Sequence, residues 1–133
     1  ASPAYLKEHG IPLTPDDLHR HAIVSTSSLA PHLEWRFRNN GAPLSIRLQP
    51  RLSTTTNDSA IAAVVGGFGL TRRLSYQVAE DLRTRRLKTV LADYEPEPVP
   101  IHVVHREGRQ AAQRVRAFID LAIERLRSDP SLN

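Results

Sequence analysis

Short apolar runs alternate along this chain with segments whose apolar residues recur at helical spacing. Residues 22–25 form a mostly apolar run that predicts a buried strand. Leu44, Ile46 and Leu48 occupy every second position, which is typical of a half-buried strand. Residues 60–65 predict a helix that is apolar almost all round and is therefore buried on most sides. Strands that alternate with helices in this way predict an α/β fold with a mainly parallel sheet.

Start and stop signals predict two further helices in the first third. The motif Thr-Pro-Asp-Asp-Leu at residues 14–18 indicates a short helix, because threonine caps a helix and proline suits its first position. Residues 31–41 predict a second helix, since Leu33 and Phe37 align at i and i+4 and an Asn-Asn-Gly triplet follows them.

The second half continues the alternation and ends in the most regular pattern of the chain. We expect a helical turn over residues 78–82, a strand over 87–91 and, after a proline-rich extended segment, a strand over 101–105. Apolar residues then form one continuous stripe at helical spacing from Ala111 to Leu126, which predicts a long amphipathic helix.

The basic charge of the chain comes almost entirely from arginine. The 133 residues contain 18 Lys and Arg, of which 16 are Arg, and the net charge is +4. Only Arg72-Arg73 and Arg85-Arg86 are adjacent, and aromatic residues make up 5% of the chain. Nucleic-acid sites concentrate basic side chains with interleaved aromatics. We therefore attribute the arginines to composition and expect no direct nucleic-acid contact from these residues.

Several other classes of site lack their sequence patterns. The absence of cysteine excludes disulfides, cysteine-ligated zinc and a thiol nucleophile. The six histidines have no metal-ligand spacing, and the chain has neither a Gly-x-Ser-x-Gly nor a Gly-x-Gly-x-x-Gly motif. No apolar run approaches the roughly 20 residues that span a bilayer. We expect no metal, no cofactor, no catalytic residue and no membrane segment.

A set of short motifs points to one protein family. Trp35-Arg36-Phe37 is followed by Gly41, Asn57 precedes Ala60 by three positions, and a Gly-Phe-Gly-Leu sequence occupies residues 67–70. Each motif is weak alone, but their order and spacing extend over nearly the whole chain. Together they resemble the C-terminal effector-sensing (substrate-binding) domain of LysR-type transcriptional regulators, in truncated form.

The resemblance implies a domain organisation. The family's sensor has two Rossmann-like subdomains of periplasmic-binding-protein type with a ligand cleft between them. By this resemblance, residues 1–5 are the first crossover strand and residues 6–98 are subdomain II. Residues 99–133 are the return crossover strand and the C-terminal helix of an incomplete subdomain I. The winged helix-turn-helix that binds promoter DNA lies upstream of this chain.

The resemblance also implies a function. We expect a cytoplasmic, bacterial, homo-oligomeric regulator that is not an enzyme, in which a small effector, such as an organic or aromatic acid, shifts the subdomain arrangement. Promoter DNA is then bound only through the missing N-terminal domain. The alternative is a solute-binding or carrier-type α/β domain with no role at DNA. A third, weaker interpretation is an enzyme of unrecognised type.

Three polar segments are candidates for effector binding. Thr55, Thr56 and Asn57 precede a predicted helix, whose N-terminus attracts anions, although Asn57 or Asp58 could simply cap that helix. A second segment, Ser25 and Thr26, follows a predicted strand, where ligands of open α/β sheets bind, although a polar turn explains it equally well. The third segment consists of Thr71 and Arg72. The Arg72 guanidinium could hold an effector carboxylate or remain a solvated surface group.

The final helix raises a separate expectation. In the family its apolar face packs on subdomain I, most of which is missing here. An uncovered apolar stripe of this size is an association surface. We expect the chain to self-associate through Val115, Phe118, Ile119 and Ile123, unless the helix folds back onto the chain's own sheet.

Overall fold

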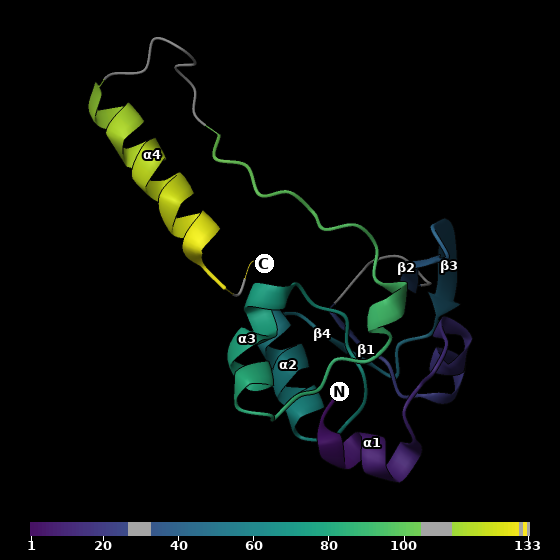
Figure 1. Ribbon diagram of the computed structural model, residues 1–133. Coiled ribbons are helices and arrows are strands. Elements are labelled where there is room, and N and C mark those ends of the chain that lie inside the picture. The colour runs from purple at the N-terminus through teal and green to yellow at the C-terminus, as the bar shows by residue number, and fades with distance from the viewer. Residues whose placement is uncertain (27–32, 105–112, 131, 133) are drawn as a thin grey trace. The chain divides into compact units, whose positions relative to one another are not determined.

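The computed structural model describes residues 1–26, 33–104, 113–130 and 132 (Figure 1). It divides into two compact units, Ala1–Glu97 and Pro98–Asn133. The first unit contains α1 (Pro3–His9), η1 (Pro15–Arg20), β1 (Val24–Thr26), β2 (Leu33–Asn39), β3 (Ala42–Leu48), β4 (Leu52–Thr54), α2 (Asn57–Val65), α3 (Ser75–Arg83) and η2 (Ala92–Tyr94). The second contains α4 (Gln113–Ser128).

The parallel part of the fold confirms the predicted α/β class. Strand β1 pairs in parallel with β4, and Ile23 forms a parallel bridge with Leu70 on the other side. The backbone N–H of Leu70 donates to the Ala22 carbonyl at 2.8 Å, and that of Val24 donates to the Leu70 carbonyl at 2.8 Å. Helix α2, predicted at residues 60–65, covers β1 and β4.

Gly69 allows this close approach of backbones. A Cβ atom at Gly69 would lie 2.1 Å from the Ala22 carbonyl oxygen, well inside van der Waals contact. The carbonyl cannot move away, because it accepts the hydrogen bond of Leu70. The second glycine of the Gly-Phe-Gly-Leu motif is therefore required by packing between backbones.

Two hydrophobic cores lie on either side of β1. One is formed by Val24, Ala60, Val64 and Leu87, beneath α2 and α3. The other joins α1 and η1 to the β2–β3 hairpin and consists of Tyr5, Leu6, Leu18, Ile23, Trp35, Phe37, Ile46, Leu48 and Leu70. Figure 1 shows the hairpin on the opposite side of β1 from α2 and α3. The two cores cover the faces of the β1–β4 pair, and loop residues stand before and after both strands.

The helix predicted for residues 31–41 is wrong. Residues 33–39 form β2, which pairs antiparallel with β3 over seven residue pairs from Leu33↔Leu48 to Asn39↔Ala42. The i, i+4 spacing of Leu33 and Phe37 also fits a period of two, and Trp35 between them is buried. Asn40 and Gly41 have φ values of 48° and 83°, as the two-residue hairpin turn requires.

The crossover strand expected at residues 1–5 is also wrong, because Pro3–His9 form helix α1. The Ser2 hydroxyl caps this helix by accepting from the Tyr5 N–H at 3.3 Å, Pro3 occupies its first turn, and Gly10 ends it with φ of 85°. The helix predicted from residues 14–18 is confirmed as the short 3₁₀ helix η1, with a capping box between Thr14 and Asp17.

The strand predicted at residues 87–91 does not form. After α3, predicted at residues 78–82 and confirmed, the chain turns through Arg85 at φ of 58° and reaches Leu91 at φ of 60°. Such left-handed backbone interrupts an extended strand. The backbones of Lys88 and Ala1 exchange two hydrogen bonds, at 2.8 and 3.2 Å, without forming a longer ladder.

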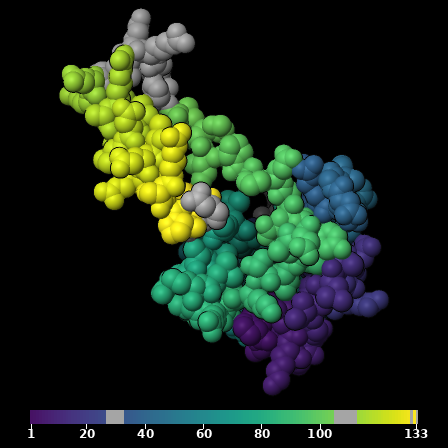
Figure 2. Space-filling view, in the orientation of Figure 1, coloured from purple at the N-terminus to yellow at the C-terminus, as the bar shows by residue number. Residues whose placement is uncertain are grey.

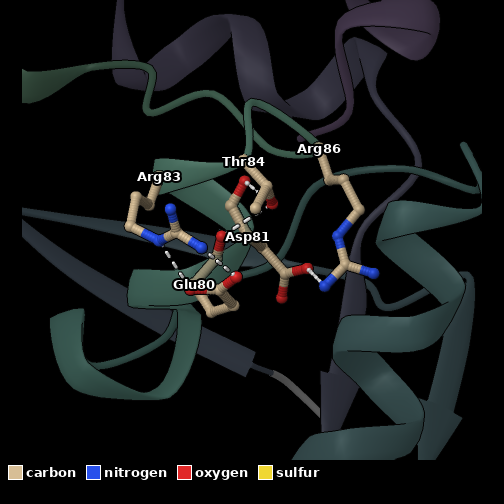
Figure 3. A network of polar contacts seen from close by, with 5 residues as sticks. All are labelled: Glu80, Asp81, Arg83, Thr84 and Arg86. Carbon is tan, nitrogen blue, oxygen red and sulfur yellow. Dashed lines mark hydrogen bonds and ion pairs between the residues drawn. The ribbon is translucent and has the colours of Figure 1, made fainter.

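A polar network closes the C-terminal end of α3 and fixes this turn (Figure 3). Arg83 donates two hydrogen bonds to the Glu80 carboxylate, at 2.8 and 2.6 Å. The Arg86 guanidinium contacts the buried Asp81 carboxylate at 2.8 Å. Thr84 Oγ1 donates to the Glu80 carbonyl at 2.7 Å, which satisfies one of the last carbonyls of the helix.

The second unit has less regular structure than the sequence predicts. Residues 101–104 form no strand, and residue 105 of that prediction lies outside the described residues. The amphipathic helix is confirmed as α4, with its predicted Ala111 also outside the described residues. Among the described residues, no helix is long and apolar enough to cross a membrane.

Candidate functional site

The carboxyl ends of β1 and β4 bring two of the predicted polar segments together. The parallel register places Thr26 opposite Thr54 and Ser25 opposite Ser53. Thr54 Oγ1 lies 3.4 Å from the Ser25 carbonyl and 2.9 Å from the Thr56 carbonyl, and it can donate to either. We call Ser25, Thr26 and the segment 54–57 the hydroxyl edge.

The N-terminus of α2 opens at this hydroxyl edge. Thr56 is the capping residue, because its Oγ1 accepts from the Ser59 N–H at 3.1 Å. The alternative that Asn57 or Asp58 caps the helix is therefore wrong. Asn57 and Asp58 are the first two helical residues, whose N–H groups have no acceptor within an α-helix. Thr55, Thr56 and Asn57 are exposed, so this positive helix end is open to a ligand.

Two of the predicted hydroxyls are occupied by backbone partners. Thr71 Oγ1 donates to the Val24 carbonyl at 2.8 Å, and Ser25 Oγ donates to the Thr26 carbonyl at 2.9 Å. The Thr71 bond connects the segment after Leu70 to β1, whereas the Ser25 bond is local to β1. Thr71 therefore lies beside β1, and its hydroxyl proton is used in a hydrogen bond within the fold.

Arg72 is directed toward the hairpin. Its Nη1 donates to the Arg36 carbonyl at 2.8 Å, and its guanidinium carbon lies 5.7 Å from the centre of the Phe37 ring. Burial lowers the pKa of Arg72, and the nearby Glu95 charge opposes this effect. The structure thus joins Arg72 to β2 and Thr71 to Val24, whereas the hydroxyl edge contains the other five predicted residues.

Sequence reasoning missed Arg73. Its Nε and Nη2 atoms are buried and have no hydrogen-bond partner within the described part of the chain, while Nη1 donates to the Arg72 carbonyl at 2.7 Å. Burial lowers its pKa. The Nε–H and Nη2–H groups of a guanidinium share one edge, which a carboxylate can accept in a bidentate manner. The adjacent Arg72-Arg73 pair was visible in the sequence, but not which arginine would lack partners.

The site offers hydrogen-bond donors and no metal ligands. Within residues 1–26, 33–104, 113–130 and 132, no group of three His, Cys, Asp or Glu side chains could hold a metal ion. The hydroxyls and helix N–H groups of the hydroxyl edge favour a small anion or a hydroxylated molecule. The Arg73 guanidinium is a separate donor on the segment after Leu70.

Comparison with known proteins gives a consistent result. A family model described as the LysR substrate binding domain matches residues 1–127. An uncharacterised HTH-type transcriptional regulator, YhjC of Escherichia coli K12, is 32% identical over 90% of this chain and 40% of its own length. The probable HTH-type regulator LtrA of Klebsiella pneumoniae is 26% identical over 100% of this chain and 43% of its own length. The chain thus spans about two fifths of the length of these relatives.

Solved structures share the fold. The regulatory domain of AphB from Vibrio vulnificus superposes with a TM-score of 0.73 at 24% identity, covering 94% of this chain and 62% of that one. CrgA from Neisseria meningitidis, a LysR-type transcriptional regulator, gives a TM-score of 0.73 at 21% identity, covering 95% of this chain and 43% of that one.

Proposed function

This chain belongs to the LysR substrate-binding domain family, and from that premise we propose that it is the effector-sensing part of a bacterial transcriptional regulator. In this proposal the effector is a small organic or aromatic acid. Its binding shifts the arrangement of the sensor and thereby the pose of DNA-binding domains across a homo-oligomer. The regulator works in the cytoplasm, where promoter DNA is found, and it is not an enzyme.

The unpaired guanidinium edge of Arg73 is the observation that supports an acid as the effector. A guanidinium edge that is buried without an acceptor costs free energy, about 1–3 kcal/mol for an unsatisfied group and more for a charged one. A ligand carboxylate removes this cost by accepting both N–H groups. The hydroxyl edge and the open N–H groups of α2 add donors for a second polar group of the same ligand.

The domain division remains part of the proposal. We propose that residues 6–98 are subdomain II and that residues 99–133 return to an incomplete subdomain I. Residues 1–5 lead into subdomain II, although part of this segment is helical. Ser25, Thr26, Thr55, Thr56, Asn57, Thr71 and Arg72 are the proposed effector-side residues, to which we add Arg73. Promoter DNA contacts belong to a winged helix-turn-helix upstream of Ala1.

Calorimetric titration with benzoate and with benzamide tests the ligand class. The two probes share ring and shape, so the carboxylate alone accounts for a difference between them. We expect benzoate to bind and benzamide to bind at least about tenfold more weakly, since a charge-assisted pair contributes about 1.5–3 kcal/mol. Arg73→Gln should reduce the difference in affinity between the two probes, whereas Arg47→Gln, on the exposed side of β3, should preserve it. Equal binding of both probes would contradict an acid effector.

The reading frame upstream of Ala1 distinguishes the regulator from the alternative class. A helix-turn-helix followed by a linker and half a sensor subdomain supports the transcriptional role. A secretion signal in the same place would instead select a solute-binding or carrier-type domain.

A further inference from the structure

A polar cavity lies at the amino ends of β1 and β4, at the other end of these strands from the hydroxyl edge. Its volume is about 580 Å³, within the range of small-molecule sites. Ala22 and Arg51 line it, and these residues stand just before β1 and β4, whereas the hydroxyl edge stands at the end of both strands. The rest of the lining comes from α1, η1 and the Gly67–Phe68 turn. We call this cavity the amino-end pocket. Helix α1 and its neighbours form the purple surface in Figure 2.

The charge of the amino-end pocket is positive. Five of its lining residues are basic, and none of the lining residues, all of them described, is acidic. The five are His9, His19, Arg20, His21 and Arg51. Phe68 adds an apolar surface that is 44% exposed. Two permanent guanidinium charges and three imidazoles around one cavity favour the binding of an anion. Phe68 offers a contact for an apolar part of the same ligand.

Helix ends account for only part of this charge. Helices α1 and η1 end beside the pocket, and His9, His19 and Arg20 occupy their last turns, where basic residues offset the negative end of the helix dipole. Arg51 stands before a strand and has no helix end of its own to offset. Its presence in the lining therefore needs another explanation.

Hydrogen bonds orient two of the imidazoles. The Tyr5 hydroxyl accepts from the Ala22 N–H at 2.9 Å and lies 3.2 Å from His21 Nδ1, so its own proton can be donated to that nitrogen. Neutral His21 then carries its proton on Nε2, as a donor. His9 Nδ1 lies 3.3 Å from the Tyr5 carbonyl, which can only accept. His9 therefore gains an Nε2–H donor only when its ring is protonated.

We propose that the amino-end pocket binds a small organic anion, with its acidic group between Arg20, Arg51 and His21 and its apolar part against Phe68. The ligand class is a sulfonate, phosphate or carboxylate attached to a compact apolar group. This site is separate from the hydroxyl edge and does not depend on the function proposed for that edge.

Protonation of the pocket strengthens anion binding. The titratable and charged groups that line the pocket with His21 are Tyr5 and His9 from α1, His19 and Arg20 from η1, and Arg51 before β4. Asp17 of η1 also acts on His21 through its charge. Burial and the His9 charge lower the pKa of His21, and only Asp17 opposes them. An anion in the pocket favours the charged imidazole forms, so its affinity should increase as the pH falls.

The test titrates the 133-residue chain with sodium sulfate and then with benzenesulfonate, at constant ionic strength. Both anions keep the same charge between about pH 6 and pH 8, so only the protein titrates. Imidazole ¹H–¹⁵N NMR resolves the individual histidines and calorimetry gives the affinity. We expect saturable chemical-shift changes at His9 and His21, and tighter binding of both anions at the lower pH. Benzenesulfonate carries half the charge of sulfate, but its ring contacts Phe68, so its affinity per unit charge should be higher.

Matched arginine variants locate the site. The double substitution Arg20→Gln and Arg51→Gln should weaken sulfate binding by about tenfold or more. Arg47→Gln, which removes an exposed arginine of β3, should leave it within about twofold. Shifts that never saturate, or a loss caused equally by Arg47→Gln, would show only diffuse attraction to a basic protein and overturn the proposal.

Discussion

Residues 1–97 and residues 98–133 both contain strong apolar patterns, but only the first unit buries them. The first contains two cores with Val24, Ala60 and Val64 fully buried, whereas none of the described residues of the second is buried. Helix α4 leaves Phe118 68% and Leu121 51% exposed. An isolated helix of 16 residues is marginal in water. The apolar stripe of α4 therefore needs a packing surface that the second unit itself does not supply.

The most damaging single change should be Gly69→Ala, in the first unit. The added methyl would lie 2.1 Å from the Ala22 carbonyl oxygen, between backbones that cannot separate without breaking the parallel pairing. We expect a loss of about 3 kcal/mol in the free energy of unfolding. Urea titration followed by fluorescence measures it, because Trp35 is the single tryptophan and is buried in this unit.

Gly10→Ala is the matched control for Gly69→Ala. Gly10, unlike Gly69, has a positive φ of 85°, and its Cβ would meet nothing within 4 Å. Gly10→Ala should therefore cost about 1–2 kcal/mol of backbone strain with no steric clash. Equal costs at the two glycines would mean that close packing at Gly69 is not what holds the first unit together.

The next largest effect should come from the double substitution Phe118→Ser and Ile123→Ser, in the second unit. If α4 mediates self-association, as its exposed apolar stripe leads us to expect, the two changes together remove about 1.5–3 kcal/mol of apolar burial from the interface, because Ile123 is already half-buried. Sedimentation equilibrium should then show a shift toward monomer, while Trp35-detected unfolding of the monomer remains unchanged. Glu124→Ser, on the opposite face of α4, is the control and should leave association intact. Monomer at high concentration for the unsubstituted chain contradicts this role for α4.

A smaller effect is expected from Thr56→Ala at the hydroxyl edge. The substitution removes the cap that accepts from the Ser59 N–H, which costs about 1 kcal/mol. Thr55→Ala, at the exposed neighbour that does not cap α2, should cost little. Urea midpoints for the two variants measure the contrast, and equal midpoints would show that the cap does not stabilise the first unit.

The smallest effect should be a pH dependence confined to the first unit. The pKa of His21 is lowered in the folded state, chiefly by burial, so the unfolded chain takes up the proton more readily. The first unit should therefore lose stability as the pH falls from above about 6.5, the usual pKa of histidine, toward the lower pKa that His21 has in the folded state. Tyr5, His9, His19, Arg20 and Arg51 face the same pocket, and Asp17 opposes the shift. His21→Gln should flatten the acid side of the Trp35-detected profile in a sulfate-free buffer, and an unchanged profile would assign the dependence to another group.

Local patterns predicted the elements whose geometry depends on near neighbours. Helix α2 follows from its apolar composition, η1 from its Thr-Pro start, and α4 from its stripe of helical spacing. The two polar segments of the hydroxyl edge were each predicted as candidates, but the parallel pairing of β1 with β4 that brings them together was not. The hairpin was missed although Asn40-Gly41 is a strong hairpin signal, because the i, i+4 spacing of Leu33 and Phe37 fits a strand as well as a helix.

The α/β class, the amphipathic nature of α4 and the choice of polar candidate segments all follow from residues that are near one another in the chain. Contacts between distant segments decided which extended segments became strands. The pairing of residues 87–91 stops at the two bonds between Lys88 and Ala1, and residues 101–104 form no strand. Such contacts also decided that Arg72 bonds to β2 while Arg73 has an unpaired edge, and they grouped His9, Arg20 and Arg51 around one pocket. Periodicity encodes the face of an element, but pairing partners and pocket linings depend on residues that are distant in the chain.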